Sequence, residues 1–209
     1  MIPVKEYRAY RNAYIGLNHK IMDSCLKHDR LQASAKLLGI VHRDVMVFEN
    51  EEETSVLMDF ALHEYKEDGK NAIALYREKV GGKSAMERSI LNALLSSRAS
   101  LFRIELVSLT DNTTTLRDLL SEEPPARLLD IGLSCSGTPG FSIFVRLVPF
   151  KDLFMTSGIS FVFPPSQEKD LLEQYEKLRR KTEPDRLSME KFVYFFGRSR
   201  KEGLRVIYR

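Results

Sequence analysis

The chain has 209 residues, and 32 lysine and arginine side chains against 29 aspartate and glutamate side chains give a formal net charge of +3. A hydrophobic content of 43% predicts a buried core, and no uncharged apolar stretch approaches the roughly 18–20 residues of a membrane-spanning helix. Only two cysteines, Cys25 and Cys135, exclude a disulfide framework and a four-cysteine zinc site. The segment 1–10 is charged and has no apolar run, so we expect no signal peptide and a reducing cytoplasm.

The charges are unevenly distributed along the chain. Residues 49–68 contain one basic and eight acidic side chains, whereas residues 166–209 contain twelve basic and eight acidic ones. A net charge of +3 is too small to make the whole chain a general polyanion binder. The basic excess near the C-terminus is compatible with a local basic patch or with a solvated surface.

The first hundred residues have helical periodicity. The first helical face contains residues spaced three and four apart, namely Val4, Tyr7, Tyr14, Leu17 and Ile21. Capping residues and glycines bound four further predicted helices, which are Asp29–Leu38, Glu51–Glu67, Asn71–Val80 and Ser84–Arg98. In the last of these, we expect Met86, Ile90 and Leu94 to point inward.

The string Gly81-Gly82-Lys83-Ser84 is similar to the end of a phosphate-binding loop. Arg77 occupies the position where that loop needs its first glycine, and the preceding segment has a helical rather than a strand pattern. We therefore interpret Ser84 and Glu87 as a capping box at a helix start.

Two other strings have the composition of a reactive site. The cluster His19, Asp23, Cys25 and His28 lies on or beside the first helix, but it offers no short ligand motif, so we predict no metal or cofactor. The string Gly132–Gly137 contains a serine between glycines, as a nucleophile elbow does, but its spacing is too long. We interpret it as a hairpin loop.

From Leu101 the hydrophobic period changes to two. Apolar and charged residues alternate in Phe102–Leu106, the pattern of a half-buried strand. Four further strands are predicted at 113–116, 126–131, 141–148 and 154–163. Because their connections leave no room for crossover helices, we predict a five-stranded antiparallel sheet or small barrel.

After the double proline at 164–165, we expect a helix capped by Ser166 and a short helix, Met189–Phe196, that ends at Gly197. The second helix has an aromatic face formed by Phe192, Phe195 and Phe196. The predicted fold class is α+β. The domains are a helical lobe at 1–100, an antiparallel β unit at 101–165, and C-terminal helices at 166–209 that pack on the junction.

The β stretch also resembles a known module. The elements that carry the resemblance are Leu101–Ile104, Leu116–Leu120, Asp130–Ser134, Phe144–Pro149 and Ser157-Gly158. Their order resembles the small β module of uncharacterised prokaryotic proteins related to SEC-C-containing proteins. The zinc motif of SEC-C is absent here, so the resemblance implies a fold but no metal and no reaction.

Three functions remain open. The leading hypothesis is a non-enzymatic binding or adaptor protein with a protein partner, because no acid–base pair, nucleophile or metal set is readable. The alternative is nucleic-acid binding through a C-terminal strip of basic and aromatic residues, which are Arg198, Arg200, Lys201, Arg205 and Tyr208. The third is an enzyme whose site is assembled on the β unit from Glu105, Asp118, Asp130 and Arg146.

Overall fold

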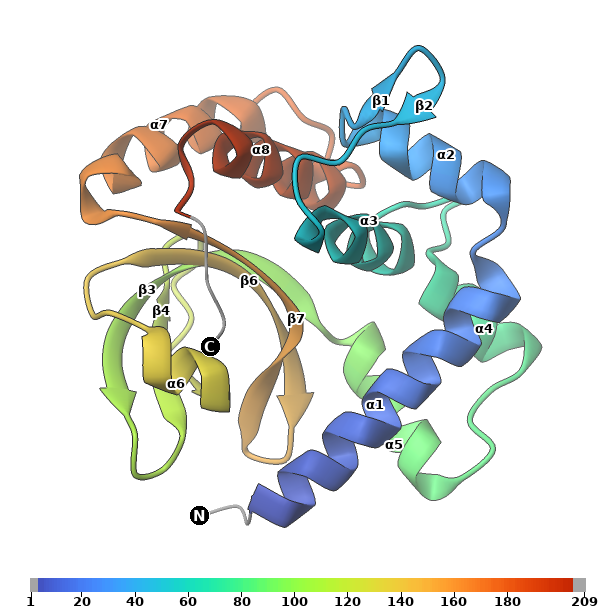
Figure 1. Cartoon of the computed structure of the whole chain (residues 1–209), viewed down its shortest axis with the longest axis horizontal. Coiled ribbons are helices and arrows are strands. Elements are labelled where there is room, and N and C mark those ends of the chain that lie inside the picture. The colour runs from blue at the N-terminus through green and yellow to red at the C-terminus, as the bar shows by residue number, and fades with distance from the viewer. Residues whose placement is uncertain (1–3, 205–209) are drawn as a thin grey trace. The chain divides into compact units, whose positions relative to one another are not determined.

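The computed structural model describes residues 4–204 and divides the chain into two compact units. The helical unit comprises residues 1–96, and the barrel unit comprises residues 97–209 (Figure 1). The two C-terminal helices belong to the same unit as the five barrel strands.

The helical unit contains five helices and one two-stranded hairpin among its described residues. These are α1 (Val4–Cys25), α2 (His28–Leu37), β1 (Val41–His42), β2 (Val45–Met46), α3 (Glu52–His63), α4 (Ala72–Lys79) and α5 (Ala85–Leu95). The predicted face of α1 is confirmed from Tyr7 to Ile21, which are buried, while Val4 at the helix start is exposed. Helix α1 packs against α4 and α5.

The capping interpretation of Ser84 is confirmed. The Ser84 hydroxyl accepts a hydrogen bond from the Glu87 amide at 3.1 Å. The Glu87 carboxylate accepts a hydrogen bond at 2.8 Å from the amide of Lys83, one residue before the cap, and not from the Ser84 amide as in a strict capping box. The prediction for Met86 is wrong: it is 46% exposed, because the buried stripe of α5 begins one turn later, at Ile90.

The barrel unit contains all five predicted strands. They are β3 (Arg98–Ser108), β4 (Thr113–Asp118), β5 (Ala126–Leu129), β6 (Ser142–Phe150) and β7 (Leu153–Phe163), and they form a closed barrel in the order β3-β4-β5-β7-β6. The fully antiparallel prediction is wrong for one pair: β5 and β7 are parallel, with Leu128 opposite Phe154. The two strands are not consecutive in the chain. After β5 the chain forms a short helix and then β6, and β7 returns between β6 and β5.

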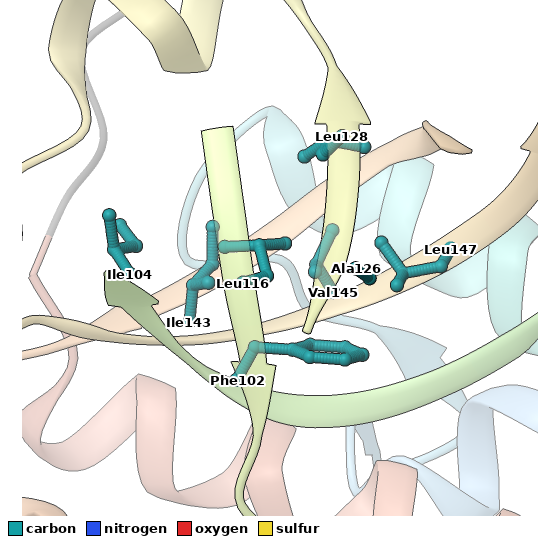
Figure 2. Packing of buried hydrophobic residues seen from close by; sticks show 8 residues of the cluster. All are labelled: Phe102, Ile104, Leu116, Ala126, Leu128, Ile143, Val145 and Leu147. Carbon is teal, nitrogen blue, oxygen red and sulfur yellow. The ribbon is translucent and has the colours of Figure 1, made fainter. Parts of the chain in front are cut away.

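The barrel interior is apolar (Figure 2). Its cluster consists of Phe102, Ile104, Leu116, Ala126, Leu128, Ile143, Val145 and Leu147. The predicted alternation of β3 holds only as far as Ile104, since the β3–β4 register shifts between Ile104 and Leu106. The resulting bulge turns both Glu105 and Leu106 to solvent, and Leu106 is 61% exposed instead of buried.

The predicted hairpin loop after β5 is instead a short helix, α6 (Ile131–Ser136). The Asp130 carboxylate accepts a hydrogen bond from the Leu133 amide at 2.9 Å and so caps the helix. Its other oxygen accepts a hydrogen bond from the Thr156 hydroxyl on β7 at 2.9 Å. A helix between the third and fourth strands of a five-stranded barrel in this order is the connectivity of the OB-type barrel.

The C-terminal elements are η1 (Pro165–Gln167), α7 (Glu168–Arg179) and α8 (Leu187–Glu202), and α7 and α8 lie side by side over the barrel (Figure 1). The buried rings of Phe192, Phe195 and Phe196 pack against Phe144 of β6 and Phe161 of β7. Ser166 lies in η1 and does not cap α7. The predicted end at Gly197 is also wrong, because α8 continues to Glu202.

Candidate functional site

The C-terminal basic residues that the structure describes contact their own unit. The Arg198 guanidinium forms ion pairs with Asp170 at 2.7 Å and Glu202 at 2.5 Å, and its side chain is 17% exposed. Arg200 lies 5.3 Å above the Phe196 ring, and Lys201 is exposed. Two further members of the predicted strip, Arg205 and Tyr208, lie outside the described residues.

The four residues considered for an enzyme do not converge. Glu105 is on the solvent side of β3 and forms an ion pair with Arg117. Asp118 is at the end of β4, whereas Asp130 hydrogen-bonds through its amide to Asn112, just before β4 begins. These two carboxylates therefore lie at opposite ends of one strand. Arg146 is buried on β6.

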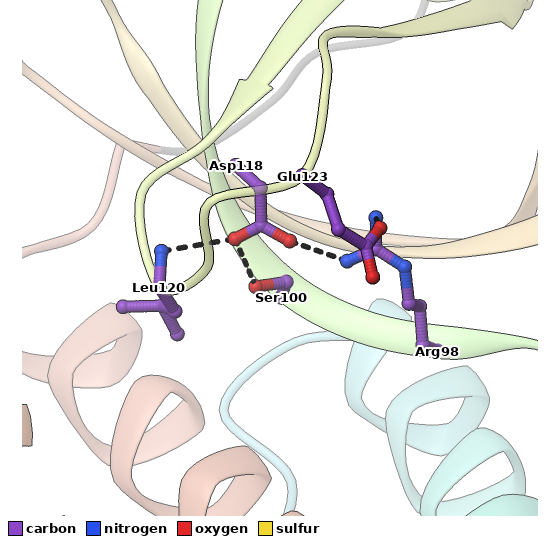
Figure 3. A network of polar contacts seen from close by, with 5 residues as sticks. All are labelled: Arg98, Ser100, Asp118, Leu120 and Glu123. Atoms are coloured by element: carbon purple, nitrogen blue, oxygen red, sulfur yellow. Dashed lines mark hydrogen bonds and ion pairs between the residues drawn. The ribbon is translucent and has the colours of Figure 1, made fainter.

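Asp118 organises a polar network at its end of the barrel (Figure 3). One carboxylate oxygen accepts hydrogen bonds from the Ser100 hydroxyl at 2.7 Å and the Leu120 amide at 2.9 Å. The other pairs with Arg98, which also pairs with Glu123. Both oxygens are thus occupied by groups that tie the β4–β5 connection to β3, which is a structural role.

The cluster considered for a metal does not share one environment. Cys25 is buried, whereas His19, Asp23 and His28 are exposed. Among residues 4–204, no three histidine, cysteine, aspartate or glutamate side chains are placed to hold a metal ion together.

Three adjacent strands carry arginines on the outer surface of the barrel. Arg103 on β3 lies opposite Arg117 on β4, and Arg127 on β5 lies opposite Thr115, two residues before Arg117. Both sequence neighbours of Arg103 and Arg127, and the residue before Arg117, belong to the apolar barrel interior, so the three arginines point outward. We call Arg103, Arg117 and Arg127 the arginine face.

The three arginines differ in how tightly they are held. Arg103 forms a two-pronged ion pair with Glu168, and the Ser142 hydroxyl donates a further hydrogen bond to Glu168 at 2.9 Å. Arg117 pairs with Glu105 where both side chains are substantially exposed. The Arg127 side chain is exposed and has no ion pair or hydrogen bond to any residue between 4 and 204. Arg103 is therefore fixed by its ion pair, Arg117 is held by an exposed pair, and the Arg127 side chain is unpaired among residues 4–204.

The Arg103–Glu168 pair predicts a pH dependence of stability. Hydrogen bonding from Arg103 is the main reason that the pKa of Glu168 is lowered. A lowered pKa means that the pair stabilises the fold fully above the unfolded-state pKa of about 4.3, and that this contribution is lost as pH falls through the folded-state pKa.

We therefore expect Glu168→Gln to be less stable than wild type at pH 7, with the difference in free energy of unfolding shrinking to zero in acid. Urea unfolding at a series of pH values measures this. Glu173→Gln, which removes an exposed carboxylate 3.9 Å from Lys169, is the matched control and should show no such trend. A constant difference for Glu168→Gln from pH 7 to pH 2 would contradict the assignment.

Sequence reasoning did not single out the arginine face. The available signal was the alternation itself, because each arginine stands beside an inward-facing residue: Phe102, Leu116 and Leu128 respectively. What the sequence does not contain is the register that places three separate strands side by side.

The arrangement suits a polyanionic ligand. Guanidinium groups bind phosphate oxygens in forked geometry, and two exposed leucines near the β3–β4 turn, Leu106 and Leu109, add apolar surface. Within β4 and β5, the outward-facing positions carry no aromatic ring, so the face offers charge and no ring surface. An anion bound there would be held chiefly by electrostatic attraction.

No curated protein and no solved structure matches the chain. Among residues 4–204, no helix has both the length and the apolar character that crossing a membrane requires. One family model matches from residue 1 to residue 209, and the chain thus belongs to the Family of unknown function (DUF7986).

Proposed function

We propose that this chain is a non-enzymatic binding protein whose barrel unit binds single-stranded nucleic acid. The observation that carries the proposal is the arginine face, which lies on the outer side of β3, β4 and β5. In OB-type barrels the second and third strands and the adjoining loops form the ligand surface, and here those strands are β4 and β5. The same fold hosts many functions, so the ligand class follows from the residues on the face.

Charge and coverage support this surface over the rest of the barrel. The barrel unit contains 18 basic and 15 acidic side chains, so it accounts for the entire net charge of +3, while the helical unit contains 14 of each. The outer side of β6 and β7 is covered by the phenylalanines of α8. Arg117 and Arg127, in contrast, are exposed to solvent.

The expected affinity is modest and dependent on salt. With electrostatic contacts and no aromatic platform, we expect a dissociation constant of about 10⁻⁴ to 10⁻⁶ M at physiological salt, as for non-specific binding. Each phosphate contact contributes about 0.7 to the slope of log affinity against log salt for a single strand. Fluorescence anisotropy of a labelled twelve-nucleotide oligothymidylate, titrated with the full chain at several salt concentrations, measures the dissociation constant and the salt slope.

The double variant Arg117→Glu/Arg127→Glu should bind this oligonucleotide at least tenfold more weakly than wild type. The double variant Arg179→Glu/Arg180→Glu, at the C-terminal end of α7, makes the same charge change at exposed positions and should retain most of the affinity. Equal losses in the two variants, or binding that does not respond to salt, would contradict the proposal. Decaglutamate serves as a second probe, and binding as tight as that of the oligonucleotide would indicate an acidic protein partner instead.

A protein-binding adaptor is the second candidate, and the β1–β2 hairpin favours it. Val45, Val47 and Phe48 are 62%, 49% and 37% exposed, and clustered exposed apolar residues are typical of interaction sites. Cross-linking followed by mass spectrometry tests this candidate. A partner whose cross-links map to residues 41–48 and disappear in Val45→Asp would support it, and the same cross-links in both proteins would reject it.

For either candidate we propose a cytoplasmic location, because both cysteines are free.

A further inference from the structure

Two members of the arginine face are placed to act together. Thr115 and Arg127 are directly opposed in the β4–β5 ladder, and Arg117 is two residues beyond Thr115 on the same side of β4. Arg117 and Arg127 are therefore diagonal neighbours, with side chains that start roughly 7–8 Å apart. Long guanidinium side chains at that separation can contact one ligand backbone together.

A carboxylate of the protein already occupies one of them. The bulge in β3 turns Glu105 to the outer surface, where it pairs with the Nε atom of Arg117. The Arg117 and Glu105 side chains are 50% and 30% exposed, and a pair this exposed adds little stability, so a competing anion can replace it.

The third arginine is held differently. Glu168 accepts two hydrogen bonds from Arg103 and one from Ser142, which is fully buried, and the Glu168 side chain is only 16% exposed. A phosphate would have to displace a carboxylate anchored on two sides. Arg103 is therefore committed to the contact between the barrel and α7.

We infer that Arg117 and Arg127 form a two-arginine phosphate clamp, in which the Glu105 carboxylate occupies Arg117 until a phosphate of the ligand displaces it. This inference rests on the proposed function and adds to it a built-in competitor that sets the affinity. Arg127 makes the first contact because it is unpaired among the described residues, and Arg117 makes the second after exchange. Arg103 stays paired with Glu168 throughout.

Removal of the competing carboxylate should increase the affinity for the ligand, whereas a variant that damages the fold would decrease it. We expect Glu105→Gln to bind labelled oligothymidylate about twofold to fivefold more tightly than wild type at low salt, the range that corresponds to an exposed ion pair. Glu173→Gln on α7 removes the same charge from an exposed carboxylate whose ion pair is with Lys169 and not with an arginine of the face, and it should leave the affinity within about 1.5-fold of wild type. Both variants keep the side-chain size, so misfolding is not a concern.

The salt slope identifies the phosphate contacts separately. We expect Arg117→Ala and Arg127→Ala each to lower the slope by about 0.7, and Lys169→Ala on α7 to leave it unchanged. Equal affinities for Glu105→Gln and Glu173→Gln, or an unchanged slope in Arg117→Ala, would overturn the clamp. If either result is obtained while the wild-type protein binds the oligonucleotide with the expected salt dependence, nucleic-acid binding stands and only the clamp is rejected. Absence of wild-type binding would overturn the proposed function itself.

Discussion

Replacement of Phe195 with aspartate should unfold the barrel unit. Phe195 is fully buried, and its ring lies 4.7 Å from Phe144, 5.7 Å from Tyr175 and 4.9 Å from Tyr194, measured between centroids. Loss of a buried phenylalanine costs about 3–5 kcal/mol, and a buried unpaired carboxylate adds several kcal/mol more. Domains are stable by only about 5–15 kcal/mol, so little stability would remain.

Circular dichroism and thermal unfolding measure this effect. The β-sheet signal and its cooperative transition should be lost, and the product should aggregate. Phe48→Asp is the control, because Phe48 is already 37% exposed and the same substitution there should change the transition little. A soluble Phe195→Asp protein that melts like wild type would refute the role of the aromatic cluster.

The second large effect is expected at Asp118. Its side chain is only 2% exposed, and it accepts hydrogen bonds from Ser100, Leu120 and Arg98. Asp118→Ala leaves these three donors without their acceptor, and removal of one partner of a buried charge pair costs about 3–5 kcal/mol. Asp118→Asn keeps an acceptor for Ser100 and Leu120 and should cost about half as much.

Chemical denaturation of the two variants tests the order of these costs. Asp185→Ala removes an exposed carboxylate between α7 and α8 and should stay within about 0.5 kcal/mol of wild type. If Asp118→Ala were as stable as Asp185→Ala, the network would not hold the β4–β5 connection as we describe.

The five barrel strands could be predicted because a period of two is a local property of the sequence. The parallel β5–β7 pair could not, since it depends on the path of β6 between them. Strand pairing also decides the orientation of Leu106. The alternation of apolar and charged residues in β3 predicts that Leu106 is buried, but the β-bulge turns it to solvent. The arginine face arises from register between strands, and so no single segment of sequence indicates it.

The predicted end of the last helix was wrong because tertiary contacts outweighed a local signal. Gly197 predicts a stop, but a glycine inside a helix costs only about 1 kcal/mol relative to alanine. Packing of Phe196 and the ion pairs of Arg198 with Asp170 and Glu202 stabilise the last turns of α8 and outweigh that cost. The β1–β2 hairpin was missed because its turn residues, Arg43 and Asp44, take positive φ angles of 48° and 62° that usually indicate glycine or asparagine.

The most direct test of the central claim is a map of the ligand contact on the full chain. Backbone amide shifts recorded by NMR during titration with oligothymidylate should change first at Thr115, Arg117 and Arg127. Amides on the exposed side of α8, such as Lys201, should remain unchanged. Shifts concentrated on α8, or on the β1–β2 hairpin, with β4 and β5 unaffected, would contradict binding at the arginine face.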